Sequence, residues 1–172
     1  AGDRGNTVAA DPVTGLVTLA GQTASTDLPV RLAVQPGLAG GTDGFVARFD
    51  PAGSGAAALV FSTYLGGSGA DVLSAVSLDA SGRAALAGET SSTDLPPLFA
   101  PQPAYGGGGD ALVAELSPSG EALGFLTYLG GPGGDAAAGI ASRPSGGELW
   151  VAGRTTGGFP SLDPLQPDGG GA

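Results

Sequence analysis

The chain has 172 residues, of which 34 are glycine, 14 are proline and 41% are hydrophobic. This composition is too apolar for a disordered chain and too rich in glycine and proline for a helical one, so we expect an all-β fold. The net charge of −10 argues against nucleic acid and anionic membranes as partners, and no apolar run is long enough for a membrane span.

The chain is built from a repeated unit. Residues 20–23 (Ala-Gly-Gln-Thr) are answered at 87–90 and 152–155, and the Phe-Ser-Thr-Tyr-Leu-Gly-Gly segment at 61–67 returns at 125–131. Self-similarity of this kind is typical of a supersecondary unit stacked on copies of itself. We therefore interpret residues 1–172 as one repeat region with units at about 1–63, 64–127 and 128–172, the last of them incomplete.

Each complete unit predicts four strands. In the second unit, short alternating apolar runs bounded by turn residues predict strands at 73–78, 83–89, 111–116 and 122–128, forming two hairpins joined by a long Pro- and Gly-rich loop. In the third strand of the first unit, Arg48 occupies the position that Glu115 holds in the second. We expect this face of the strand to meet solvent.

A four-stranded antiparallel unit in tandem predicts the blades of a β-propeller, and the small residues Ala75, Ala85 and Ala87 suit crowded strands near its axis. The chain holds about two and a half blades, fewer than the usual minimum of about four. It should therefore not close a ring alone. A protein partner or further copies of the chain are expected to complete the open blade edges.

Three segments carry a family resemblance: 62–71 (Ser-Thr-Tyr-Leu-Gly-Gly-Ser-Gly-Ala-Asp), the Asp-Ala-Ser-Gly turn at 79–82, and 87–96, which ends in Thr-Asp-Leu-Pro. Together they resemble the bacterial SBBP repeat of seven-bladed-type β-propellers. The third copy departs from the pattern, because Arg143 replaces the aspartate of the turn and only Pro160 remains of Thr-Asp-Leu-Pro. The resemblance implies secreted or cell-surface bacterial proteins built as propeller arrays, and it does not imply an enzyme.

The residues exclude most catalytic chemistry. Without histidine, cysteine or lysine there is no Ser-His-Asp or Cys-His site, no Schiff base, and no zinc site of His or Cys ligands. A carboxylate-dependent hydrolase stays open, but the acids recur at equivalent repeat positions, as turn-forming residues do. We therefore predict no enzyme and no catalytic residue.

Calcium is the one cofactor that the sequence leaves open. Asp3, Asp71 and Asp135 sit at equivalent places beside glycine-rich turns, and carboxylates with loop carbonyls suit a hard cation. Each glycine-rich loop offers a single acid, however, and the spacing is wrong for an EF-hand. The favoured interpretation is no cofactor, with Asp71, Asp79 and Asp94 accepting hydrogen bonds from their own turns.

The candidate binding residues are apolar. Leu95, Pro96, Pro97, Leu98 and Phe99 form an extended segment of a long loop, which either seals the gap between blades or docks a partner. Tyr64 and Tyr128 share one repeat position and are predicted to pack between blades. Trp150 has no aromatic counterpart, so it is either a core residue or a partner contact.

These observations favour a non-enzymatic structural or interaction scaffold in an extracellular, cell-surface or periplasmic bacterial setting. The alternatives are a calcium- or carbohydrate-binding adhesion module and, less favoured, the carboxylate-dependent hydrolase. The first residues include no start methionine, and the glycine run at 167–172 resembles the one at 105–110. We expect the chain to be processed or to be part of a larger array.

Overall fold

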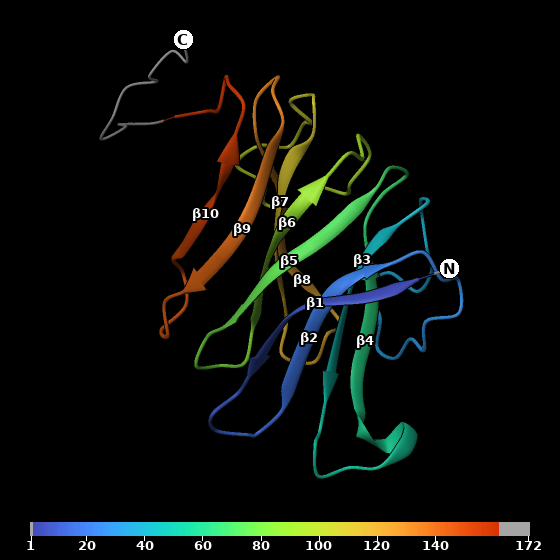
Figure 1. Ribbon diagram of the computed structural model, residues 1–172. Coiled ribbons are helices and arrows are strands. Elements are labelled where there is room, and N and C mark those ends of the chain that lie inside the picture. The colour runs from blue at the N-terminus through green and yellow to red at the C-terminus, as the bar shows by residue number, and fades with distance from the viewer. Residues whose placement is uncertain (1, 162–172) are drawn as a thin grey trace.

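The computed structural model describes residues 2–161 and is all-β, with three antiparallel sheets (Figure 1). The glycine run at 167–172, which resembles residues 105–110 in sequence, lies outside the described residues. The first sheet contains β1 (Asp3–Ala10), β2 (Val17–Thr23), β3 (Asp43–Phe49) and β4 (Leu59–Leu65), with the short 3-10 helix η1 (Gly55–Ala58) before β4. The second contains β5 (Asp71–Leu78), β6 (Ala84–Thr90), β7 (Asp110–Leu116) and β8 (Leu123–Leu129). The third pairs β9 (Asp135–Ser142) with β10 (Leu149–Thr155).

The four strands predicted for the second unit are confirmed, with bounds that differ by at most about two residues. Each four-stranded sheet is ordered as the chain runs, so β6 pairs with β7 despite the long loop between them. Within the described part of the chain, no helix is long and apolar enough to cross a membrane.

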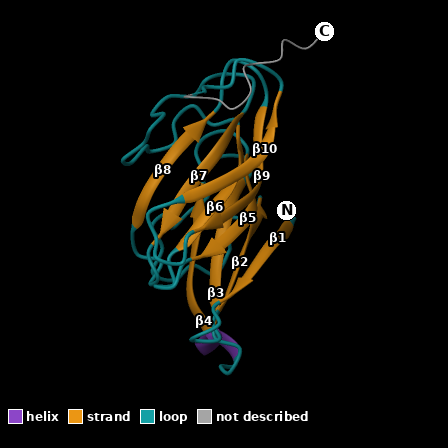
Figure 2. Cartoon of the chain, turned by 90° about the vertical axis from the view of Figure 1, so that its left-hand side faces the viewer, coloured by secondary structure: helices purple, strands orange, loops and turns teal. Residues whose placement is uncertain are grey.

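The sheets follow one another in space as they do in sequence, and β5 contacts both β1 and β9 (Figures 1 and 2). We call the face that carries Phe45 and Phe49 in the first sheet, and Leu112 and Leu116 in the second, the front face. The opposite face is the back face. The back face of the first sheet packs on the front face of the second, and we call this contact the first boundary; the contact between the second and third sheets is the second boundary.

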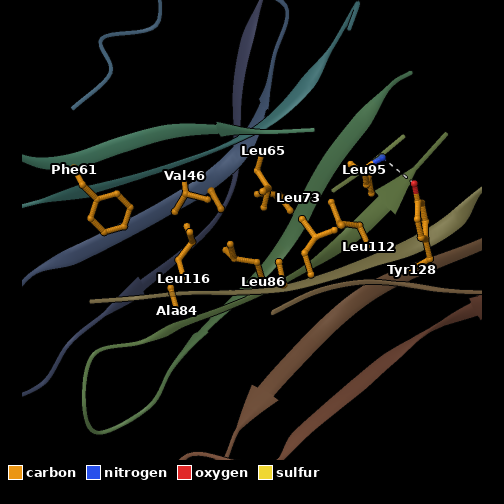
Figure 3. Close-up of a cluster of buried hydrophobic side chains, with 13 residues drawn as sticks. Val46, Phe61, Leu65, Leu73, Ala84, Leu86, Leu95, Leu112, Leu116 and Tyr128 are labelled. Carbon is orange, nitrogen blue, oxygen red and sulfur yellow. Dashed lines mark hydrogen bonds between the residues drawn. The ribbon is translucent and has the colours of Figure 1, made fainter. Parts of the chain in front are cut away.

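Large aliphatic and aromatic side chains fill the first boundary (Figure 3). Val46 and Phe61 of the first sheet are fully buried in one cluster with Leu86, Leu112 and Leu116 of the second. Burying a side chain of this size stabilises the fold by about 1.5–3 kcal/mol. This cluster is the main core of the described residues.

The second boundary is built from smaller side chains. Ala75, Ala87 and Ala111 of the second sheet form a separate cluster with Ala137 of β9, and Ile140 packs against them half-buried. Ala75, Ala85 and Ala87, the small residues predicted to lie in crowded strands, are all buried. Alanine allows close approach but buries little apolar area, so the second boundary gains less from the hydrophobic effect.

Each first strand carries a β-bulge near a glycine of the second strand. The register shifts after Gly5 in β1 and after Leu73 in β5, and again opposite Gly153 in the third sheet. A Cβ on Gly21, Gly88 or Gly153 would lie 1.9, 1.8 or 2.2 Å from a carbonyl oxygen of the bulged strand. Only glycine fits there, which explains the Ala-Gly-x-Thr segment that recurs in all three units.

The predicted solvent exposure of Arg48 is wrong. Its side chain crosses the first boundary and is 2% exposed. The guanidinium donates to Thr18 Oγ1 and to the carbonyl oxygens of Pro118 and Gly82, each at 2.8 Å, and lies over the Phe61 ring. Burial lowers the pKa of Arg48, and the charge of Asp11 opposes that shift. Two of these acceptors, the Pro118 and Gly82 carbonyls, belong to turns of the second sheet. The pattern of charges within one strand could not indicate a contact with another sheet.

Candidate functional site

The predicted docking segment is divided between core and surface. Leu95 is 3% exposed, and its N–H donates to the Tyr128 hydroxyl at 2.9 Å (Figure 3). Leu98 exchanges two backbone hydrogen bonds of 3.0 Å with Leu126, which ties the loop to the outer strand β8. Pro96 and Pro97 are exposed, and Phe99 is 84% exposed with a left-handed φ of 46°. Much of this segment therefore fastens the loop to its own sheet.

The long loop of the first sheet is fastened in the same way. Arg31 exchanges backbone hydrogen bonds with Ser62 of β4. The Tyr64 hydroxyl donates to the Ser25 carbonyl at 2.8 Å and accepts from the Leu28 N–H at 3.1 Å. Tyr64 and Tyr128 are both buried, and their hydroxyls anchor the long loop of their own unit.

Both long loops end on a buried aspartate that begins the third strand of a sheet. Asp43 accepts from the Gln35 side chain at 2.7 Å, and Asp110 accepts from that of Gln102 at 3.1 Å. Both aspartates are 0% exposed. Neither aspartate was among the predicted site residues, although each follows a glycine-rich loop and opens a strand, a recurrence that could have marked them.

Each of these aspartates meets the aspartate that begins the next sheet, so folding creates two acid pairs. A Cβ on Gly66 would lie 2.6 Å from Asp71 Oδ2 and 2.8 Å from Asp43 Cγ. A Cβ on Gly130 would lie 2.8 Å from Asp135 Oδ2 and 2.9 Å from Asp110 Oδ1. We call Asp43 and Asp71 the first acid pair, and Asp110 and Asp135 the second. The sequence predicted a single acid in each glycine-rich loop, but the two acids of each pair come from different loops.

The first acid pair is fully supplied with donors. Asp71 accepts from the hydroxyls of Thr90 and Ser92 and from the Gly67 N–H. The Asp43 carboxylate accepts from Gln35 and from the backbone N–H groups of Ala39 and Gly40. Burial nevertheless raises the pKa of Asp71, more than these donors lower it, and the charge of Asp43 adds to the rise.

The second acid pair has fewer donors. Oδ2 of Asp110 accepts from Gln102 and Gly106, and Oδ2 of Asp135 accepts from the Gly131 N–H. Oδ1 of Asp110 and Oδ1 of Asp135 are buried and accept no hydrogen bond from any residue that the structure describes. Burial raises the pKa of Asp110 against the lowering effect of the Gly106 and Gly107 N–H groups, and the charge of Asp135 raises it further.

A pocket of about 270 Å³ reaches the second acid pair from solvent. Its wall includes Thr90, Gly109, Asp135 and Thr156, and it carries the ion pair of Arg154 with Glu89 at 3.4 Å. Asp110 is not part of the wall, so Asp135 is the member of the pair that lines the pocket. The wall also includes Glu89, the partner of Arg154 in that ion pair.

The other predicted calcium and turn residues occupy different environments. Asp3 is exposed and accepts from the Thr23 hydroxyl, whereas Asp71 and Asp135 are buried. Asp79 accepts from the N–H groups of Ser81 and Arg83 in its own turn, as predicted. Asp94 does not serve its own turn: it accepts from Ser68, in the connection between β4 and β5. Among residues 2–161, no three acids gather as a metal site.

Trp150 lies on the back face of the third sheet and is 56% exposed. Its counterparts Thr18 and Ala85 are buried, each by the sheet that follows its own. Within the described residues, Trp150 is therefore outside the core.

Comparison with known proteins does not identify a family for this chain. No family model matches the chain, and no curated protein matches it.

Proposed function

We propose that the chain is a non-enzymatic scaffold of β-propeller-type repeats that assembles head to tail with a second copy of itself. One observation carries the proposal. The front face of the first sheet has the same construction as the front face of the second, which is covered by a neighbouring sheet.

The equivalent positions differ in what covers them. Leu86 and Leu116 are 0% exposed in the first boundary. Their counterparts in the first sheet are Leu19 and Phe49. Leu19 is half-buried, and Phe49 is 36% exposed. Both line an apolar groove of about 350 Å³ with Leu28, Pro29 and Leu59. The back face of a sheet is the surface that fits such a groove, because the first boundary joins these same two faces.

The third sheet offers such a back face. Trp150 stands where Thr18 and Ala85 contact the following sheet, and large aromatic side chains are frequent anchors of protein interfaces. A front face at one end and a back face at the other make the contact heterologous, so copies would add head to tail.

The packing of first strands on one another supports a propeller-type arrangement, since β1, β5 and β9 approach closely while the outer strands β4 and β8 do not take part in that contact. The SBBP resemblance supports an extracellular, cell-surface or periplasmic location in bacteria. Both remain parts of the proposal.

Light scattering over a range of protein concentrations tests the assembly. The chain should form dimers or longer oligomers, and Phe49→Asp and Trp150→Asp should each yield monomers. Mixing these two variants should restore a complex that stops at two chains, since each contributes one intact face. Phe99→Asp is the matched control, because Phe99 is exposed and lies in a loop outside the strands that form the two faces. A chain that is monomeric at every concentration would overturn the proposal.

A further inference from the structure

The second acid pair is an unusual environment for two carboxylates. Asp110 is 0% and Asp135 is 3% exposed, and one oxygen of each accepts no hydrogen bond from any described residue. Leaving a buried charged oxygen without a partner is costly, and two adjacent carboxylates also repel each other. Something outside the described residues is needed to balance them.

The third unit differs from the second in one side chain beside its aspartate. Ser92, whose hydroxyl donates to Asp71 at 2.8 Å, is replaced by Gly157 in the third unit. Thr155, the counterpart of Thr90, is retained, and its hydroxyl accepts from the Gly157 N–H at 3.1 Å, as that of Thr90 accepts from the Ser92 N–H at 2.9 Å. Unlike Thr90, it makes no hydrogen bond to Oδ1 of its aspartate, Asp135. The third unit has thus kept the acid while losing a side-chain donor to it.

Other oxygens lie beside the pair. The carbonyl oxygens of Gly130 and Gly131 lie 3.0 and 2.6 Å from the position of a Cβ on Gly106, whose N–H donates to Asp110. Gly107, Gly108 and Gly109 all have left-handed φ angles, so this loop follows a path that glycine favours. Carboxylate and backbone carbonyl oxygens in an irregular loop are the ligands that calcium takes.

The charge around the site also favours a cation. Arg154 is the arginine of the adjoining pocket, and it pairs with Glu89 there. The pocket wall includes Asp135, so the pocket brings solvent next to one member of the pair. We propose that Asp110 and Asp135, with the carbonyl oxygens of the 130–131 segment, bind a calcium ion that joins the second sheet to the third.

The experiment compares the two acid pairs by thermal melting and by calorimetric titration with CaCl₂ of EDTA-treated, desalted protein. Millimolar CaCl₂ should raise the melting midpoint of the wild-type chain by about 3 °C or more and give one binding event per chain. Asp110→Asn should abolish both effects. Asp43→Asn, at the donor-supplied first acid pair, should leave both in place.

A second pair of variants changes no charge. Gly130→Ala places a methyl group between Asp110 and Asp135 and should abolish the calcium response, while Gly66→Ala makes the same change between Asp43 and Asp71 and should preserve it. Circular dichroism shows whether each variant is folded. A wild-type chain with no binding heat and no calcium-dependent midpoint would overturn the proposal, as would a Gly130→Ala variant that responds fully. A midpoint that falls with rising pH but ignores calcium would show that a shared proton balances the pair instead.

Discussion

The two boundaries join the same kind of sheet with different chemistry. At the first, large aliphatic side chains fill the contact, Arg48 crosses it, and every oxygen of the acid pair has a donor. At the second, alanines make the contact and two carboxylate oxygens lack donors from the described residues. The differences fall at positions where a later unit has changed, such as Arg48 to Glu115 in the second unit and Leu86 to Val151 in the third. A repeat can thus preserve its backbone while its boundaries diverge in strength.

The largest difference should appear on truncating equivalent apolar residues. Leu86→Ala removes a fully buried side chain from the first boundary and should lower the free energy of unfolding by about 3 kcal/mol. Val151→Ala, at the equivalent position of β10, should cost less than about 1 kcal/mol because Val151 is 37% exposed. Urea denaturation followed by circular dichroism measures both. Equal losses would show that the two boundaries are equally packed.

Removing the arginine of the first boundary should have the next largest effect. Arg48→Met leaves the Gly82 and Pro118 carbonyls without their donor and should lower the free energy of unfolding by about 2 kcal/mol. Arg83→Met is the control, since its side chain is 41% exposed and its solvent-screened ion pair with Asp79 should contribute much less. The same urea titration distinguishes them. If Arg48→Met leaves the free energy of unfolding unchanged, Arg48 does not contribute to the difference between the two boundaries.

The first acid pair should show a pH signature. The pKa of Asp71 is raised by burial, so its contribution to stability is complete below its unfolded pKa of about 3.8 and is lost as pH rises through the higher folded value. The stability of the wild type relative to Asp71→Asn should therefore fall as the pH rises above about 4.

Asp94 supplies a control of opposite sign. The Ser68 N–H and hydroxyl lower its pKa, so the stability of the wild type relative to Asp94→Asn should fall as the solution is acidified. Urea titrations at several pH values test both slopes. The same slope for both variants would contradict the assignment of burial to one and exposed hydrogen bonding to the other.

The smallest effect is expected at the open end of the third sheet. Trp150→Ser should change the free energy of unfolding of the isolated monomer by no more than about 0.5 kcal/mol, because Trp150 is 56% exposed. Thermal melting at low protein concentration measures it. A loss comparable with that of Leu86→Ala would place Trp150 in a core.

The sequence predicted what depends on local pattern. Alternation and turn residues located the strands of the second unit, and the Asp79 turn has the hydrogen bonds expected of it. What failed depends on neighbouring sheets. Arg48 is buried because turns of the second sheet reach it, and Asp94 bonds to Ser68 rather than to its own turn.

The acid pairs were missed for the same reason. Asp43 and Asp71 are far apart in a repeat alignment, and they meet only because one sheet packs on the next with Gly66 between their carboxylates. Repeat symmetry indicated that each acid recurs, but a search for acids within one loop could not find a pair shared by two loops. The propeller arrangement itself is still a prediction.

The glycine near each bulge has a consequence for the history of the repeat. A side chain at Gly21, Gly88 or Gly153 would collide with a backbone carbonyl, and no change of a flexible neighbour can relieve a collision with backbone. Acids, serines and the Thr-Asp-Leu-Pro segment can drift, as the third unit shows, while this position is fixed by geometry. Divergent copies of the unit in other sequences are therefore best aligned on this glycine, which should outlast the motifs that first made the repeat visible.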